Sequence, residues 1–174
     1  MTYAEPAPAM PAVEVSTWGR RFGAWLIDSL IFGIPFFMIM FGRIGAEMDA
    51  AGVIDPISGE PSQSAMETVM NDMLGFITGM TAVYYVVFAL YLILMHGTVG
   101  STLGKMATGI KVVKADGSKC DLPTAAKRAL VYPIAALVPF VGGLIALLNG
   151  LWPLWDSKKQ SLGDKVGGSY VVRK

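Results

Sequence analysis

The stretch Arg21-Phe-Gly-Ala-Trp-Leu-Ile-Asp28 opens a long apolar run and places a carboxylate inside it. On a helix, residues seven apart lie on one face, about two turns or ~10 Å apart along the axis. Arg21 can therefore sit at a membrane surface while Asp28 lies inside the hydrocarbon. An aspartate in that position costs roughly 2.5–3.5 kcal/mol on insertion scales. The rest of the chain must therefore supply polar partners for it.

Apolar residues dominate the composition: of 174 residues, 53% are hydrophobic and 16% are charged. Three stretches, 22–42, 73–95 and 129–155, contain no charged residue other than Asp28. Each reaches the length of about 20 residues that a helix needs to cross a ~30 Å hydrocarbon core. The sequence therefore predicts an all-α integral membrane protein, with two full transmembrane helices at roughly 18–41 and 73–95.

The third apolar stretch differs from the other two because prolines and glycines interrupt it. Pro133 and Pro139 lie within it, and Gly142 and Gly143 follow the second proline. As one straight helix, residues 129–155 would be about 40 Å long, and the Pro-Gly centre is a natural break. We predict a broken or re-entrant helical segment that returns to the side it came from. A kinked third crossing is the alternative.

Charges are segregated along the chain although the net charge is only +1. Residues 43–73 are mostly acidic, whereas 96–128 and 156–174 are mostly basic. Basic flanks mark the cytoplasmic side of a membrane. We predict a multi-pass membrane protein with its N-terminus and residues 96–128 in the cytoplasm and the 43–73 loop outside.

Outside the apolar stretches, the sequence predicts a tail and a small sheet. Residues 1–17 are proline-rich and are expected to be a disordered tail, which leaves 18–174 as a single membrane domain. Two β-prone strips, 110–114 and 169–173, cannot be stable alone. We expect them to pair as a small hairpin-like sheet on the cytoplasmic side.

The glycine-rich segment between the second apolar stretch and the first strip does not fit a phosphate-binding loop. The residue five positions before Gly104 is Val99 rather than glycine, and Lys105 is followed by Met106 rather than by serine or threonine. We instead predict a short amphipathic helix at the inner surface, with Lys105 extending toward lipid headgroups and His96 as a polar residue of the interface. With one histidine and one cysteine in the chain, we expect no metal, no cofactor and no enzymatic activity.

Three motifs together resemble the RDD family of small bacterial membrane proteins. They are Arg21-Phe-Gly-Ala-Trp-Leu-Ile-Asp28, Gly100-Ser-Thr-Leu-Gly-Lys105-Met-Ala-Thr-Gly109 and Gln160-Ser-Leu-Gly163-Asp164. The resemblance implies that Arg21, Asp28 and Asp164 are the arginine and the two aspartates for which the family is named. Gly163 stands where the family often has a histidine, so a proton-transfer role for that histidine is absent here.

Two functions fit this polar trio. In the first, Arg21, Asp28 and Asp164, with Lys105 or Arg128 as partners, form a satisfied cluster that docks the cytoplasmic part onto the membrane helices of a structural or accessory protein. In the second, Asp28 binds a monovalent cation or a proton for small-ion transport, for example cation/proton antiport in an oligomer. Expected partners are the lipid bilayer and either further copies of the chain or a larger membrane complex; no nucleic acid is expected.

Overall fold

A computed structural model describes residues 14–52, 54, 57, 59–60, 62–132 and 141–174. The chain divides into two compact units. The first, here called the head unit, comprises the chain up to Asp28 together with Ala89–Lys174, and the second, here called the hairpin unit, comprises Ser29–Phe88.

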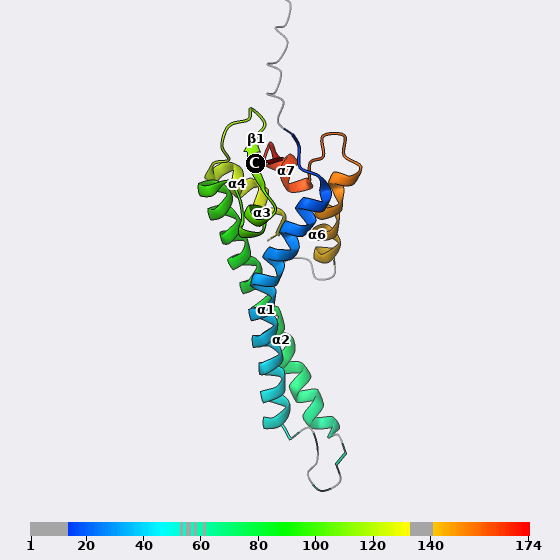
Figure 1. The fold of residues 1–174 in the computed structure, drawn as a ribbon. Helices are drawn as coiled ribbons and strands as arrows, with labels where there is room; N and C mark the ends of the chain where they lie inside the picture. The colour runs from blue at the N-terminus through cyan, green and yellow to red at the C-terminus, as the bar shows by residue number, and fades with distance from the viewer. Residues whose placement is uncertain (1–13, 53, 55–56, 58, 61, 133–140) are drawn as a thin grey trace, which may run out of the picture. The chain divides into compact units, whose positions relative to one another are not determined.

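Helices account for most of the described chain, as the sequence predicts (Figure 1). In chain order the elements are α1 (Trp18–Ala50), α2 (Gln63–Leu94), the π-helix η1 (Met95–Val99), α3 (Leu103–Ala107), β1 (Ile110–Lys114), α4 (Leu122–Ala129), α6 (Val141–Leu151), the 3-10 helix η2 (Trp152–Leu154), α7 (Leu162–Val166) and β2 (Ser169–Arg173).

In the hairpin unit, α1 and α2 continue well beyond the apolar runs. Most of residues 43–73, which the sequence predicts as a loop, are helical, because the two ends of this segment extend α1 and α2. Arg43 pairs with Glu47 one turn later, and Val69 and Met73 of α2 are buried together with packed apolar neighbours. Those neighbours are Ile44, Ala51, Ala65, Met66 and Phe76.

Both long helices are apolar enough to cross a membrane. Their large apolar side chains are mostly exposed; Phe37, Met38 and Phe41 are 57%, 71% and 68% exposed, respectively. A soluble monomer rarely exposes a contiguous apolar surface of this kind, whereas lipid tails would cover it. The two long apolar helices confirm the predicted membrane spans as candidates by length, composition and exposure.

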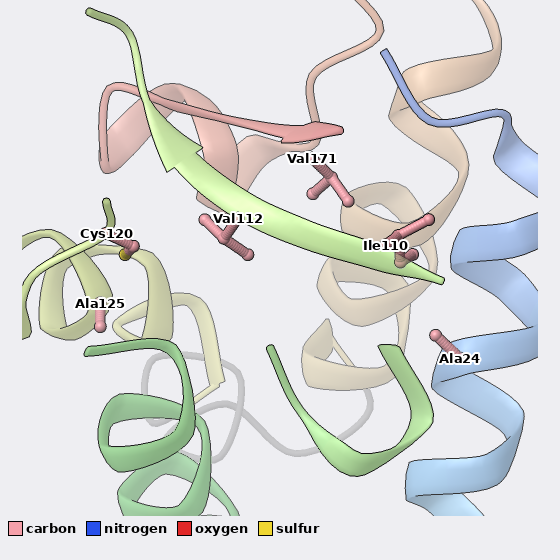
Figure 2. Packing of buried hydrophobic residues seen from close by; sticks show 6 residues of the cluster. All are labelled: Ala24, Ile110, Val112, Cys120, Ala125 and Val171. Atoms are coloured by element: carbon pink, nitrogen blue, oxygen red, sulfur yellow. The ribbon is translucent and has the colours of Figure 1, made fainter. Parts of the chain in front are cut away.

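The predicted pairing of the two β-prone strips is confirmed in the head unit. β1 and β2 form a two-stranded antiparallel sheet in which Ile110 lies opposite Arg173 and Val112 opposite Val171. Figure 2 shows the small core beneath this sheet, with side chains from both strands facing residues of α1 and α4. Its members are Ala24, Ile110, Val112, Cys120, Ala125 and Val171.

Each strand follows a short helix, and the two helix–strand units are built alike. In α3 the hydroxyl of Thr102 accepts a hydrogen bond from the backbone N–H of Lys105 at 3.2 Å. In α7 the hydroxyl of Ser161 accepts one from the N–H of Asp164 at 3.1 Å. Lys105 and Asp164 therefore occupy the same position of the first turn, three residues after the cap.

The likeness extends at one constant sequence offset from before the caps to the ends of the strands. Gly109 and Gly168 both have positive φ, at 67° and 58°. The side chain of Ser101 donates to the Ile110 carbonyl at 3.0 Å, and that of Gln160 donates to the equivalent Ser169 carbonyl at 2.9 Å. The left-handed residue before each cap is also equivalent, Gly100 with φ 80° and Lys159 with φ 52°.

The register of the sheet places equivalent residues opposite each other at its centre. Val112 and Val171 hold the same position in the two helix–strand units, and they are paired across the antiparallel sheet. The two helix–strand units, α3 with β1 and α7 with β2, are thus related by a local two-fold axis. Residues 102–114 and 161–173 form two copies of one cap–helix–strand motif, which we call the paired motif.

Residues near the two ends of the third apolar stretch both lie close to Gly163. A Cβ atom on Gly163 would lie 2.9 Å from the carbonyl oxygen of Arg128 and 3.5 Å from the side-chain oxygen of Asn149. A continuous helix between Arg128 and Asn149 would separate them by about 30 Å. The chain therefore returns between these residues, as the broken or re-entrant prediction requires. The break predicted at Pro139 lies outside the described residues.

Candidate functional site

Asp28 of α1 is buried in the head unit and is held by uncharged donors. The residue is only 4% exposed. One carboxylate oxygen accepts from the Thr102 hydroxyl at 2.6 Å. The other accepts from the Tyr91 hydroxyl at 2.9 Å and from the backbone N–H of Gly104 at 2.8 Å. These three donors offset the cost of burying the carboxylate.

Gly104 allows the backbone of α3 to approach α1 this closely. A Cβ atom at this position would clash with the carbonyl oxygen of Ala24 and would lie 3.0 Å from the carboxylate carbon of Asp28. The Tyr91 hydroxyl also accepts a hydrogen bond from the N–H of Leu103 at 2.8 Å. The start of α3 is therefore fixed on α1 by its backbone amides.

Asp164, in the second copy of the paired motif, is fully buried and binds two arginines. One oxygen accepts from Arg21 at 2.7 Å and from the backbone N–H of Ser161 at 3.0 Å. The other accepts from Arg128, which also donates to the hydroxyl of Ser169. Burial opposes ionisation of this carboxyl, but the two guanidinium groups outweigh it and lower its pKa to about 2.

The two arginines tie distant parts of the chain to this carboxylate. Arg21 comes from α1 and also donates to the carbonyl of Val171 at 3.3 Å. Arg128 comes from the last turn of α4. One carboxylate of α7 thereby joins α1, α4 and the β2 strand. Among the described residues, the Nε atoms of Arg21 and Arg128 are the buried side-chain polar atoms that lack a hydrogen-bond partner.

Lys105 and His96 form a third polar contact. The ammonium nitrogen of Lys105 lies 2.7 Å from Nε2 of His96. His96 is only 3% exposed, so it is not the interfacial residue that the sequence predicts. Burial, reinforced by the positive charge of Arg128, lowers the pKa of Lys105 to about 7, although Asp164 and Asp28 act in the opposite direction. Lys105 thus turns inward rather than toward lipid headgroups.

The structure divides the residues named from the sequence between two carboxylates. Arg21 and Arg128 contact Asp164, whereas no charged side chain among the described residues donates a hydrogen bond to Asp28. The partners of Asp28 are Tyr91, Thr102 and Gly104. Sequence reasoning missed these three; the cap signal of a threonine before Leu-Gly-Lys105 was available for the second.

The fold and these contacts define a class: a small helical membrane protein in which buried carboxylates join the start of the first apolar helix to the rest of the head unit. A sequence model of the RDD family matches residues 15–168, most of the chain. The chain belongs to the RDD family.

Relatives of known sequence fall into two groups. The Bacillus subtilis proteins YckC and YxaI are 28% and 24% identical to the chain, over 87% and 88% of its length and 80% and 94% of their own. The proline-rich antigen homolog of Mycobacterium tuberculosis is 38% identical over 72 residues, 41% of this chain. That match spans about a quarter, 27%, of the mycobacterial protein. No solved structure matches the chain.

Proposed function

We propose that the protein is a structural or accessory component of the bacterial inner membrane, and that the polar trio joins the start of the first membrane helix to the rest of the head unit. The single observation that carries this proposal is that both carboxylate oxygens of Asp164 accept hydrogen bonds inside the protein. Its two oxygens accept from two arginines and a backbone amide, and it has no exposed surface. A carboxylate committed in this way holds the fold and is not free to bind a ligand.

The energetics of buried ion pairs support a role in geometry. A buried pair gives little net stability relative to an apolar replacement, but removal of one partner costs about 3–5 kcal/mol because a charge is left unpaired. Arg21 and Asp164 lie far apart in the sequence, and Arg128 adds a second link. The cluster therefore fixes which face of α1 packs against the second half of the chain.

The same contacts favour the proposed orientation in the membrane. The basic segments 96–128 and 156–174 belong to the head unit, and Arg128 and Asn149, near the two ends of the third apolar stretch, both lie close to Gly163 within it. Both observations support a location of these segments on one side of the membrane, and the basic flanks favour the cytoplasmic side. Two spanning helices bury little of their apolar surface in one chain, so we propose a homo-oligomer or a larger membrane complex.

Small-ion transport through Asp28 is the second function considered, and the geometry favours it less. A cation or proton on Asp28 would have to displace donors that already occupy both oxygens, at 2.6, 2.8 and 2.9 Å. A path would also require several copies of the chain. We propose neither a catalytic role nor a cofactor.

Flux measurements on proteoliposomes test this choice. We expect purified protein reconstituted into liposomes to show no cation-dependent proton flux above empty liposomes, and no difference between the wild type and Asp28→Asn. Asp72→Asn, at an exposed position of α2, serves as the matched control for a lost carboxylate charge. A flux that is present in the wild type and in Asp72→Asn but lost in Asp28→Asn would overturn the structural role and establish transport.

A further inference from the structure

The contact between Lys105 and His96 has no part in the junction proposed above. Its two nitrogens are 2.7 Å apart, and Lys105 makes no ion pair with a carboxylate of the described residues. A lysine held against an imidazole without a carboxylate partner is unusual, because burial disfavours its charged form. The contact therefore calls for its own explanation.

The paired motif shows that this lysine breaks a local rule. In the second copy the equivalent residue is Asp164, whose carboxylate accepts from the backbone N–H of its own cap residue, Ser161, to complete a capping box. Lys105 instead places a cation in the first turn of α3, near the N-terminus of the helix, where negative charge is favoured. Positions at which local preference is overridden are often functional.

The backbone at His96 is also irregular. His96 lies in η1, a single π-helical turn that ends α2, and such turns occur frequently at functional sites. An ammonium group can only donate hydrogen bonds, so Nε2 of His96 accepts in this contact when Lys105 is charged.

Four charged residues, from the three helices α1, α4 and α7, act on Lys105. Arg128 of α4 and Arg21 of α1 repel a positive charge on Lys105, whereas Asp164 of α7 and Asp28 of α1 attract it. Arg128 and Lys105 are the charged groups that act on His96. Both carboxylates are already neutralised or hydrogen-bonded by other partners. Burial and the two arginines therefore disfavour the charged form of Lys105, and the two carboxylates favour it.

We propose that Lys105 and His96 form an exchangeable proton site, in which the Lys105 amine takes up one proton from water and His96 accepts a hydrogen bond from it in both states. The lone pair of the amine nitrogen forms the new N–H bond as one O–H bond of a hydronium ion breaks, which leaves an ammonium group and a water molecule. A pKa of about 7 for Lys105 agrees with this assignment. The site goes beyond the structural role and does not depend on it.

The chain offers a direct test because His96 is its single histidine. Full-length protein with 15N-labelled histidine, in lipid nanodiscs, gives one imidazole whose nitrogen shifts report its tautomer and its hydrogen bonds. Across a titration from about pH 5 to about pH 9, we expect Nε2 to stay unprotonated and to show one transition near neutral pH as its donor changes from amine to ammonium.

Substitutions assign the transition to its source. Lys105→Gln is expected to abolish it, whereas Lys111→Gln, at an exposed position of β1, leaves it unchanged. If Lys105→Gln does not fold, Lys105→Arg keeps a permanent charge and is also expected to remove the transition. No transition in the wild type, or one that persists in these variants, would overturn the proposed site. Neither outcome would alter the flux result that tests the structural role.

Discussion

Lys105 and Asp164 occupy the same position in the two copies of the paired motif and carry opposite charges. Each is the third residue after a hydroxyl cap, Thr102 or Ser161. The copy with aspartate recruits Arg21 and Arg128, whereas the copy with lysine is placed beside His96. The same local structure thus provides a permanently charged junction on one side and a titratable group on the other.

Neutralising the junction carboxylate should destabilise the protein strongly. Asp164→Asn preserves shape but leaves Arg21 and Arg128 buried without a counter-charge, so we expect a loss of about 3–5 kcal/mol in the free energy of unfolding. Unfolding of the detergent-solubilised protein, followed by tryptophan fluorescence, measures it. Asp72→Asn is the control and should change stability by less than about 0.5 kcal/mol. Equal stability of the two variants would argue against the junction.

Asp28→Asn should have a smaller effect, because no ion pair is broken. The amide keeps one acceptor oxygen but turns an NH₂ group toward a donor, either the hydroxyl of Thr102 or the backbone N–H of Gly104. We expect a loss of about 1–3 kcal/mol. The same fluorescence assay measures this loss, and a variant as stable as the wild type would show that these three hydrogen bonds do not hold α3 on α1.

A methyl group at Gly104 should also separate α3 from α1. Gly104→Ala would drive a Cβ atom into the carbonyl oxygen of Ala24, and we expect a cost of about 1–3 kcal/mol. Gly150→Ala in α6 is a matched control, since no atom lies within 4 Å of its Cβ position. That variant should be neutral or slightly more stable, by up to about 1 kcal/mol. Similar losses in both variants would contradict the close approach.

The pH dependence of stability should report Lys105. Its pKa falls from 10.5 to about 7 on folding, so between these values the unfolded chain binds more protons than the folded one. Stability therefore rises with pH in this window and is independent of this group below it. Lys105→Gln should remove that rise, so that its stability relative to the wild type is highest below pH 7 and decreases toward pH 10. Parallel pH profiles from chemical unfolding would contradict this.

Much of the fold could be predicted from the sequence because its signals are local. Runs with no charge other than Asp28 predict the two long helices, and alternation within 110–114 and 169–173 predicts two short strands that could pair with each other. Helix ends were less predictable: the helical extension of α1 past Arg43 depends on its pairing with Glu47 and on packing against residues of α2.

The candidate site was predictable only in part, since its contacts join distant segments. Family resemblance identified Arg21, Asp28 and Asp164 as important, but it could not assign Arg21 to one carboxylate and Thr102 to the other. That assignment depends on how α3 and α7 pack against α1 and α4 through Gly104 and Gly163. His96 was misplaced because an apolar run followed by a polar residue is usually a membrane boundary, not a buried contact.

The junction between Arg21 and Asp164 is the central claim, and a double-mutant cycle tests it most directly. Free energies of unfolding are measured for the wild type, Arg21→Met, Asp164→Asn and the double variant under one detergent condition. We predict that the double variant loses less than the sum of the single losses, by about 1–3 kcal/mol, because each single substitution strands a buried charge. Losses that add within about 0.5 kcal/mol would show that the two residues act independently and would contradict the account.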